Sequence, residues 1–192
     1  AGLSDGVTFL TGPLDRETEI TGPIAAKLWV SSTTTDADLF LVVRAFAPDR
    51  KDVSFQGALD PHTPIAQGWL RASHRKLDPA LSLTYRPYHT HGEIQPLTPR
   101  EIYEVDVEVW PTCLVVPPGY RLALTIRGRD YEYPGGAGEG VGVLGRVFTG
   151  VGPFRHDDPR DRPAEIFGGN VTLHAGPTQA AHLLVPVIPS KS

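Results

Sequence analysis

The sequence predicts an all-β protein, folded as a jelly-roll β-sandwich with little helix. Apolar residues recur in short stretches that either alternate with polar residues or run continuously, and both patterns are typical of strands. The 192 residues include 19 prolines and 20 glycines, which mark many turns. About nine or ten short strands joined by so many turns favour a sandwich over a helical or mixed fold.

The first half of the chain contains four expected strands, at Val7–Thr11, Ala26–Ser32, Leu39–Ala47 and Gly68–Ser73. Gly-Pro and Thr/Asp turns separate the first three of these strands. Leu39–Ala47 is almost continuously apolar, so we expect both of its faces to be covered. Asp78–Leu81 could form a single helical turn.

The second half opens with another short helix signal at Thr98–Glu101, where an N-cap threonine precedes proline. Glu104–Val109 alternates strictly, which places Val105, Val107 and Val109 on one face of a strand. Two further strands, Cys113–Val116 and Leu122–Ile126, flank Pro117-Pro118-Gly119, a turn that predicts a hairpin or a short crossover. The remaining strands are expected at Val143–Phe148, Asn170–His174 and Leu183–Ile188, and Pro134–Gly152 is expected to be a mobile surface loop.

The composition favours one domain over residues 1–192, since no inter-domain linker or internal repeat is visible. A chain of this length can bury about 70% of its unfolded surface, so it needs no metal or disulfide. The net charge of -4 includes no basic block, which argues against nucleic acid. No apolar run approaches the length of a membrane span. The single cysteine, Cys113, fits a reducing compartment, and we expect a cytoplasmic location.

Two glycine motifs resemble catalytic or cofactor signatures but lie in the wrong context. Gly2–Gly6 matches the G-x-S-x-G nucleophile elbow, yet only Ala1 precedes it and a strand pattern follows it. Gly140–Gly145 matches G-x-G-x-x-G, yet a flexible loop precedes it in place of a strand. We therefore expect neither a catalytic serine nor a dinucleotide cofactor here.

The histidines and acidic clusters have structural roles as their simplest interpretation. His89 and His91 would share one face of a strand and could bind a metal, but the glycine and glutamate spacing of cupin sites is missing. Asp157 and Asp158 could bind Ca²⁺, but an arginine-paired loop is the more natural interpretation. Capping of a turn is the default role for Asp36-Ala37-Asp38. The adjacent pair Ser73-His74 does not make a catalytic triad, since strand neighbours point to opposite faces.

Five sequence blocks stand out: G-P-I-A-A-K-L-W-V-S-S-T-T-T-D-A-D-L-F, G-W-L-R-A-S-H-R-K-L-D-P, R-P-Y-H-T-H, Q-P-L-T-P-R-E and P-P-G-Y-R-L-A-L-T-I. Together they resemble one known module, the C-terminal, non-catalytic jelly-roll domain of the X-prolyl dipeptidyl peptidase and cocaine esterase (CocE/NonD acyl esterase) family. The resemblance runs from about Val7 to Pro189, with the blocks in the family's order. It departs from the family at Arg100, where glycine is frequent, and at Tyr120, where histidine is common.

This resemblance implies a galactose-binding-like sandwich attached to an upstream α/β-hydrolase domain of a bacterial serine hydrolase that cleaves acyl esters or amides. The family's catalytic triad lies in that upstream domain, so the resemblance carries no catalytic, cofactor-binding or metal-binding residue onto this chain. It implies a domain that supports the hydrolase and could contribute to homo-oligomer contacts. The chain lacks an initiator methionine, and together with the resemblance this favours a piece of a longer polypeptide. A surface apolar patch is then expected where the hydrolase packs.

A carbohydrate-binding jelly roll that acts on its own is the alternative. Such modules need exposed aromatic platforms, and the candidates are Trp29, Trp69 and Trp110. Each of them lies in or beside a strand pattern, so the sequence predicts core positions for all three.

Overall fold

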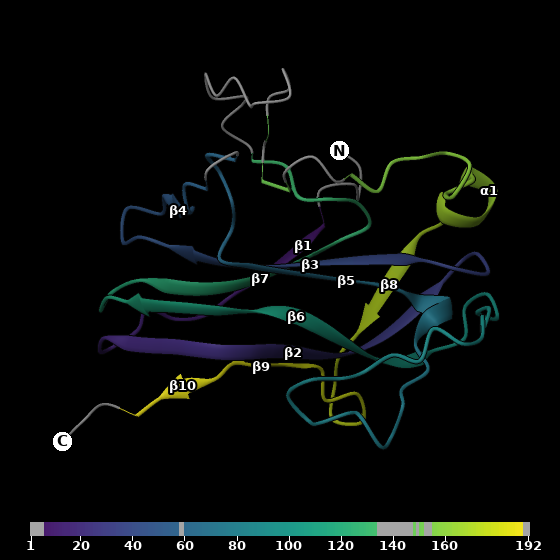
Figure 1. Ribbon diagram of the computed structural model, residues 1–192, viewed down its shortest axis with the longest axis horizontal. Coiled ribbons are helices and arrows are strands. Elements are labelled where there is room, and N and C mark those ends of the chain that lie inside the picture. The colour runs from purple at the N-terminus through teal and green to yellow at the C-terminus, as the bar shows by residue number, and fades with distance from the viewer. Residues whose placement is uncertain (1–5, 58–59, 134–147, 149, 152–154, 190–192) are drawn as a thin grey trace.

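Two antiparallel sheets of five strands each pack face to face, as the two layers of Figure 1 show. The computed structural model describes residues 6–57, 60–133, 148, 150–151 and 155–189. This arrangement confirms the expected all-β sandwich. No helix in those residues is long and apolar enough to cross a membrane.

The first sheet is built around β3 (Asp38–Phe46), whose residues Asp38–Val43 are all buried. One edge of β3 pairs with β7 (Arg121–Arg127), which pairs in turn with β1 (Val7–Leu10). The other edge pairs with β5 (Ala66–Arg71) and then with β4 (Asp52–Val53). The continuous apolar run in β3 therefore gives a strand covered on both faces, as expected.

The second sheet is built around the longest strand, β2 (Thr18–Ser32). β6 (Tyr103–Val116) pairs along one edge of it. Three short strands follow one another along the other edge: β10 (Val187–Ile188), β9 (His182–Leu184) and β8 (Val171–His174). The expected single strand Leu183–Ile188 is thus divided into β9 and β10, with residues 185 and 186 between them.

The core lies between the two sheets. On β6, Val105, Val107 and Val109 point inward and are fully buried, which confirms the alternation seen in the sequence. They pack with apolar side chains of β2 and β3. Each such buried valine stabilises the fold by about 1.5–3 kcal/mol relative to an exposed one.

β6 is longer than expected, because Cys113–Val116 continues the same strand. Residues 117–120 then cross from the second sheet to β7 in the first, so the turn there is a crossover between sheets and not a hairpin. Gly119 has a φ of 82°, a conformation that glycine adopts without strain.

The short helices differ from those expected. Thr98–Glu101 forms a turn instead of a helical turn, because Arg100 has a φ of 71°, outside the helical region. Asp78–Leu81 is a turn whose amides are capped by the Asp78 carboxylate. A 3-10 helix (Ala72–His74) directly follows β5, and the short helix α1 spans Ala164–Phe167.

Several expected features lie outside the described residues. These are Gly2–Gly6 except for Gly6, Gly140–Gly145, the strand Val143–Phe148 except for Phe148, and most of the loop Pro134–Gly152. The strand expected after Gly6 is present as β1.

Candidate functional site

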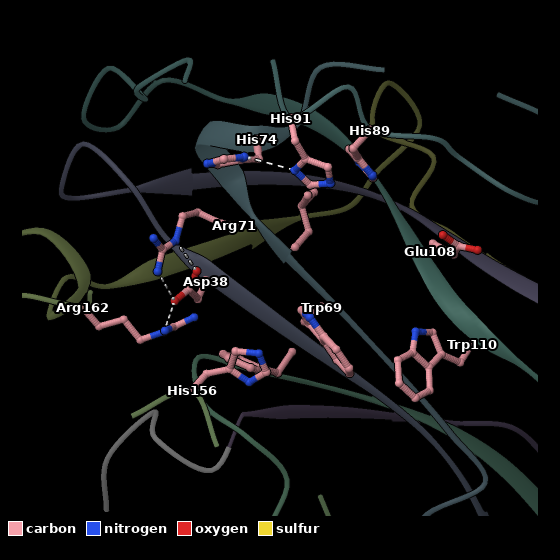
Figure 2. Close-up of a pocket in the computed structure, with 12 residues that line it drawn as sticks. Asp38, Trp69, Arg71, His74, His89, His91, Glu108, Trp110, His156 and Arg162 are labelled. Carbon is pink, nitrogen blue, oxygen red and sulfur yellow. Dashed lines mark hydrogen bonds and ion pairs between the residues drawn. The ribbon is translucent and has the colours of Figure 1, made fainter. Parts of the chain in front are cut away.

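A hollow of about 390 Å³ opens at the edge of the sandwich where β5 and β6 meet (Figure 2). Aromatic and imidazole rings make up most of its walls, and charged side chains gather at one end. We call it the β5–β6 pocket. Its lining residues are Asp38, Phe40, Trp69, Leu70, Arg71, His74, His89, His91, Glu108, Trp110, His156 and Arg162.

Gly68 brings the two strands of the β5–β6 pocket together. A Cβ atom built on Gly68 would lie 2.1 Å from the carbonyl oxygen of Glu108, closer than any real contact. Only a residue without a side chain allows the backbones of β5 and β6 to approach this closely. The residues next to this contact, Trp69 on β5 and Trp110 on β6, are therefore brought side by side.

A β-bulge in β6 lies at Trp110 and Pro111. Ile24 pairs with Val109 and Gly22 with Thr112, so Trp110 and Pro111 together lie opposite Pro23. Neither proline can donate a backbone hydrogen bond, which makes a bulge at the sheet edge the place where both are tolerated. The alternation of β6 places Trp110 on the outward face, with 61% of its area exposed, and the bulge interrupts this alternation at Pro111.

Four rings form a continuous row along one side of the pocket. The ring centroids of Trp69 and Trp110 lie 5.1 Å apart, those of Trp69 and His156 5.3 Å, and those of His156 and Phe40 5.4 Å. The Asp130 carboxylate accepts hydrogen bonds from the His156 backbone amide and lies 2.9 Å from its Nδ1 atom, which fixes that ring. The position of the His156 ring in this row is therefore fixed by hydrogen bonds within the protein.

The prediction that the three tryptophans belong to the core was wrong for Trp69 and Trp110. Trp69 is 42% exposed and Trp110 61% exposed. Trp29 is half-buried and lines a separate hollow at another edge of the sandwich. Because both exposed rings lie on edge strands, one surface of each ring has no neighbouring strand to cover it.

The charged end of the pocket is a cluster in which two arginines and two aspartates form ion pairs with one another. The Asp38 carboxylate accepts hydrogen bonds from Arg71 Nε at 3.1 Å and from Arg162 Nε at 2.6 Å. Both arginines also bond to Asp161. Two guanidinium groups and two carboxylates give the cluster no net charge.

Asp36, by contrast, caps the backbone amides of Ala37 and Ser73, as its expected turn role requires.

Three histidines form the opposite wall. His74 Nδ1 and His91 Nδ1 lie 3.1 Å apart, and His89 Nε2 lies 2.9 Å from the carbonyl oxygen of Asp106. This backbone contact agrees with the structural role expected for His89. His89 and His91 do not share a strand as expected, because His91 has a φ of 50°. Burial lowers the pKa of the His89 imidazole, so that ring is neutral at pH 7.

Metal-binding geometry is not found at the residues suggested by the sequence. Within residues 6–57, 60–133 and 155–189, no three His, Cys, Asp or Glu side chains gather closely enough to hold an ion. Asp158 pairs with Arg160, and Asp157 lies 3.9 Å from Arg155, so this loop is arginine-paired as expected. Ser73 is buried, and its hydroxyl makes no hydrogen bond to any histidine of the pocket.

The sequence interpretation missed Arg162, His156 and Glu108 as residues that line a common pocket with Trp69. Glu108 could have been found, because the alternation in β6 places it on the outward face beside Trp110. Arg162 and His156 lie outside the strands, and no local pattern indicates where such side chains will meet a strand.

A second hollow of about 470 Å³ lies at the opposite edge, between β1 and β9. Its lining is largely apolar and includes Phe9 and Leu10 of β1, Trp29 of β2, and Leu183 of β9. Phe9 and Leu10 are each more than half exposed. We call this second hollow the β1–β9 groove.

A family model, the X-Pro dipeptidyl-peptidase C-terminal non-catalytic domain, matches residues 3–184. The chain belongs to this family. The match covers every strand except β10, and it includes the whole lining of the β5–β6 pocket.

Relatives of this C-terminal domain are much longer proteins. A Mycobacterium tuberculosis protein named as a candidate serine esterase is 32% identical over 131 residues, which are 66% of this chain and 19% of that protein. Cocaine esterase of Rhodococcus sp. is 22% identical over 187 residues, which are 96% of this chain and 26% of the esterase.

Solved structures agree on the fold. A CocE/NonD family hydrolase from Staphylococcus aureus is 25% identical, with a TM-score of 0.76 over 95% of this chain and 30% of that one. An α-amino acid ester hydrolase shares the fold at 16% identity and a TM-score of 0.59. The chain thus spans less than a third of the length of each of these relatives, and it is homologous to the C-terminal part of larger hydrolases.

Proposed function

We propose that this domain is the accessory C-terminal part of a cytoplasmic serine hydrolase of the X-Pro dipeptidyl peptidase or acyl esterase type. The single observation that supports it most is the match of a non-catalytic C-terminal domain model to residues 3–184. The relatives that carry this domain include a cocaine esterase and a CocE/NonD hydrolase, and in each most of the length lies outside the matched region. The chain itself supplies no catalytic residue, metal or cofactor in this proposal.

The β1–β9 groove is where this proposal places the hydrolase domain. Phe9 and Leu10 are exposed on the edge strand β1, and the groove beside them is lined mostly by apolar side chains. A contiguous apolar surface of this kind marks an interaction site on most globular domains. Covering it would remove apolar area from water and so stabilise both domains. Other exposed apolar side chains, such as Val187 and Ile188 on β10, are available for homo-oligomer contacts.

The proposal is tested on the polypeptide encoded around this chain. The reading frame upstream of Ala1 should encode an α/β-hydrolase domain with a G-x-S-x-G elbow between a strand and a helix. That longer protein should cleave an aryl ester or an X-Pro anilide, and replacing the elbow serine by alanine should abolish cleavage. A stop codon directly upstream of Ala1, or turnover by the 192-residue chain alone, would contradict the proposal.

A further inference from the structure

Two neighbouring tryptophans lie exposed in a concave site, although tryptophan is on average one of the most buried residues. The close approach at Gly68 holds Trp69 and Trp110 side by side, and the His156 ring packs against Trp69. We propose that the β5–β6 pocket binds a neutral saccharide ring. The inference does not rest on the proposed function, since every residue of the site belongs to this chain.

The indole faces select the shape of the ligand. An aromatic face carries partial negative charge, so it favours the weakly positive C–H groups of a ring that lies flat against it. A sugar ring presents such a C–H face and carries its hydroxyl groups around the rim. Trp69 and Trp110 are tilted by 52° to each other, so one ring can lie under the sugar while the other closes its side.

The polar groups of the pocket select hydroxyl groups. The Glu108 carboxylate lines the pocket and makes no hydrogen bond or ion pair with any described residue. Across the pocket, the Nε2 atoms of His74 and His91 also have no partner among the described side chains. A carboxylate can only accept a hydrogen bond, whereas a neutral imidazole offers one donor and one acceptor. Hydroxyl groups, which both donate and accept, can satisfy all three.

The charges argue against an anion. Arg71 and Arg162 are already bonded to Asp38 and Asp161, so neither guanidinium is free to hold a phosphate or carboxylate. An anion would in addition meet the unpaired Glu108. A volume of about 390 Å³ is near the lower end of the range for small-molecule sites, which suits one sugar ring or two better than a polymer.

The chain offers a direct test, since it contains three tryptophans and so gives three indole N–H signals in a nitrogen-15 NMR spectrum. The 192-residue chain would be titrated with methyl glycosides of glucose, galactose and mannose. The signals of Trp69 and Trp110 should shift and saturate with at least one glycoside. The Trp29 signal, from the β1–β9 groove, should not move.

Variants separate this site from general surface effects. Trp110→Ala should weaken glycoside binding by about tenfold or more, because stacking on an aromatic ring is lost. Glu108→Gln should weaken it less, and Trp29→Phe should leave it unchanged. Signal dispersion in the same spectra confirms that each variant is folded.

Three outcomes would overturn the proposal. The first is the absence of a saturable shift of either pocket indole with all three glycosides. The second is binding that survives Trp110→Ala. The third is a saturable shift with tetramethylammonium but with no glycoside, because two tryptophans beside a carboxylate would then form a cation site.

Discussion

Arg100 occupies a backbone conformation that few side chains adopt. Its φ is 71°, and its amide donates a hydrogen bond of 2.6 Å to the carbonyl of Ser32, which holds the turn against the end of β2. The left-handed region costs a residue with a Cβ atom about 1 kcal/mol, whereas glycine enters it freely. This conformation gives a physical reason for the glycine that the family resemblance implies at the position of Arg100.

Replacing Arg100 by glycine should therefore stabilise the domain by about 0.5–1 kcal/mol, since the relief of strain exceeds the added freedom of the unfolded chain. Urea denaturation of the two proteins measures the difference. Arg86→Gly is the matched control, because Arg86 is exposed, lies in a neighbouring turn and has no positive φ. That substitution should destabilise the protein slightly. Equal effects of both changes would contradict the strain argument.

Gly68 is the residue on which the β5–β6 pocket depends most. A methyl group there would meet the backbone of Glu108 and Val109 at 2.1–2.9 Å, so β5 and β6 would have to separate. Gly68→Ala should cost about 1–3 kcal/mol, the usual range for an overpacked core, and should also shift the indole signals of Trp69 and Trp110. Thermal unfolding and the NMR spectrum give the two readouts. Gly128→Ala, with open space around the new methyl, should change neither.

His89 should make stability depend on pH. Burial lowers its pKa in the folded protein, so the unfolded chain takes up a proton first as the pH falls through about 6.5. The contribution of His89 to the free energy of unfolding is therefore complete above that pH and is lost as the pH drops below it. The melting temperature should therefore fall between pH 7.5 and pH 5.5, before the paired carboxylates protonate.

The variant His89→Gln keeps a donor for the Asp106 carbonyl but cannot titrate. Its melting temperature should vary less with pH over that range than that of the parent protein. His182, which is exposed and bonds only to the carbonyl of Ala180, provides the control in His182→Gln. Identical pH profiles for the parent and His89→Gln would show that the buried ring does not carry the effect.

At the scale of elements, the sequence predicts best where the pattern of burial is simple. β3 and the first half of β6 were predicted closely, because a fully buried run and a strict alternation each identify a strand from local sequence. The continuation of β6 through Pro111 could not be predicted in this way. Proline normally ends a strand, and here a bulge opposite Pro23 accommodates Pro111 so that the strand continues.

The candidate site was less predictable than the fold, since it depends on contacts between distant elements. Trp69 and Trp110 are 41 positions apart in the sequence (110 − 69). The strand pattern around each tryptophan, taken alone, predicts a core residue. Their exposure follows from the position of β5 and β6 at sheet edges, which is a property of the topology. The same holds for His74 and His91, which meet because the chain turns away from β5 after Arg71.

At the scale of the whole molecule, the two open edges of the sandwich differ in chemistry. The β5–β6 pocket combines aromatic, charged and imidazole side chains, whereas the β1–β9 groove is largely apolar. A polar concave site suits a small hydroxylated ligand, and an apolar groove suits another protein surface. The two edges can therefore serve different partners, and changes at one should leave binding at the other unaffected.

A charge placed in the β1–β9 groove tests its role in docking the hydrolase domain. Phe9→Lys changes a side chain that is already 52% exposed, so the 192-residue chain should unfold at nearly the same temperature as before. In the longer polypeptide, the lysine would be buried against an apolar partner without a counter-charge, which is costly. The half-life of hydrolase activity on heating should shorten by about tenfold. Val115→Lys is the matched control, because Val115 on β6 is equally exposed, at 52%, and does not line the groove. If the two variants lose activity at the same rate, the hydrolase domain does not pack against β1.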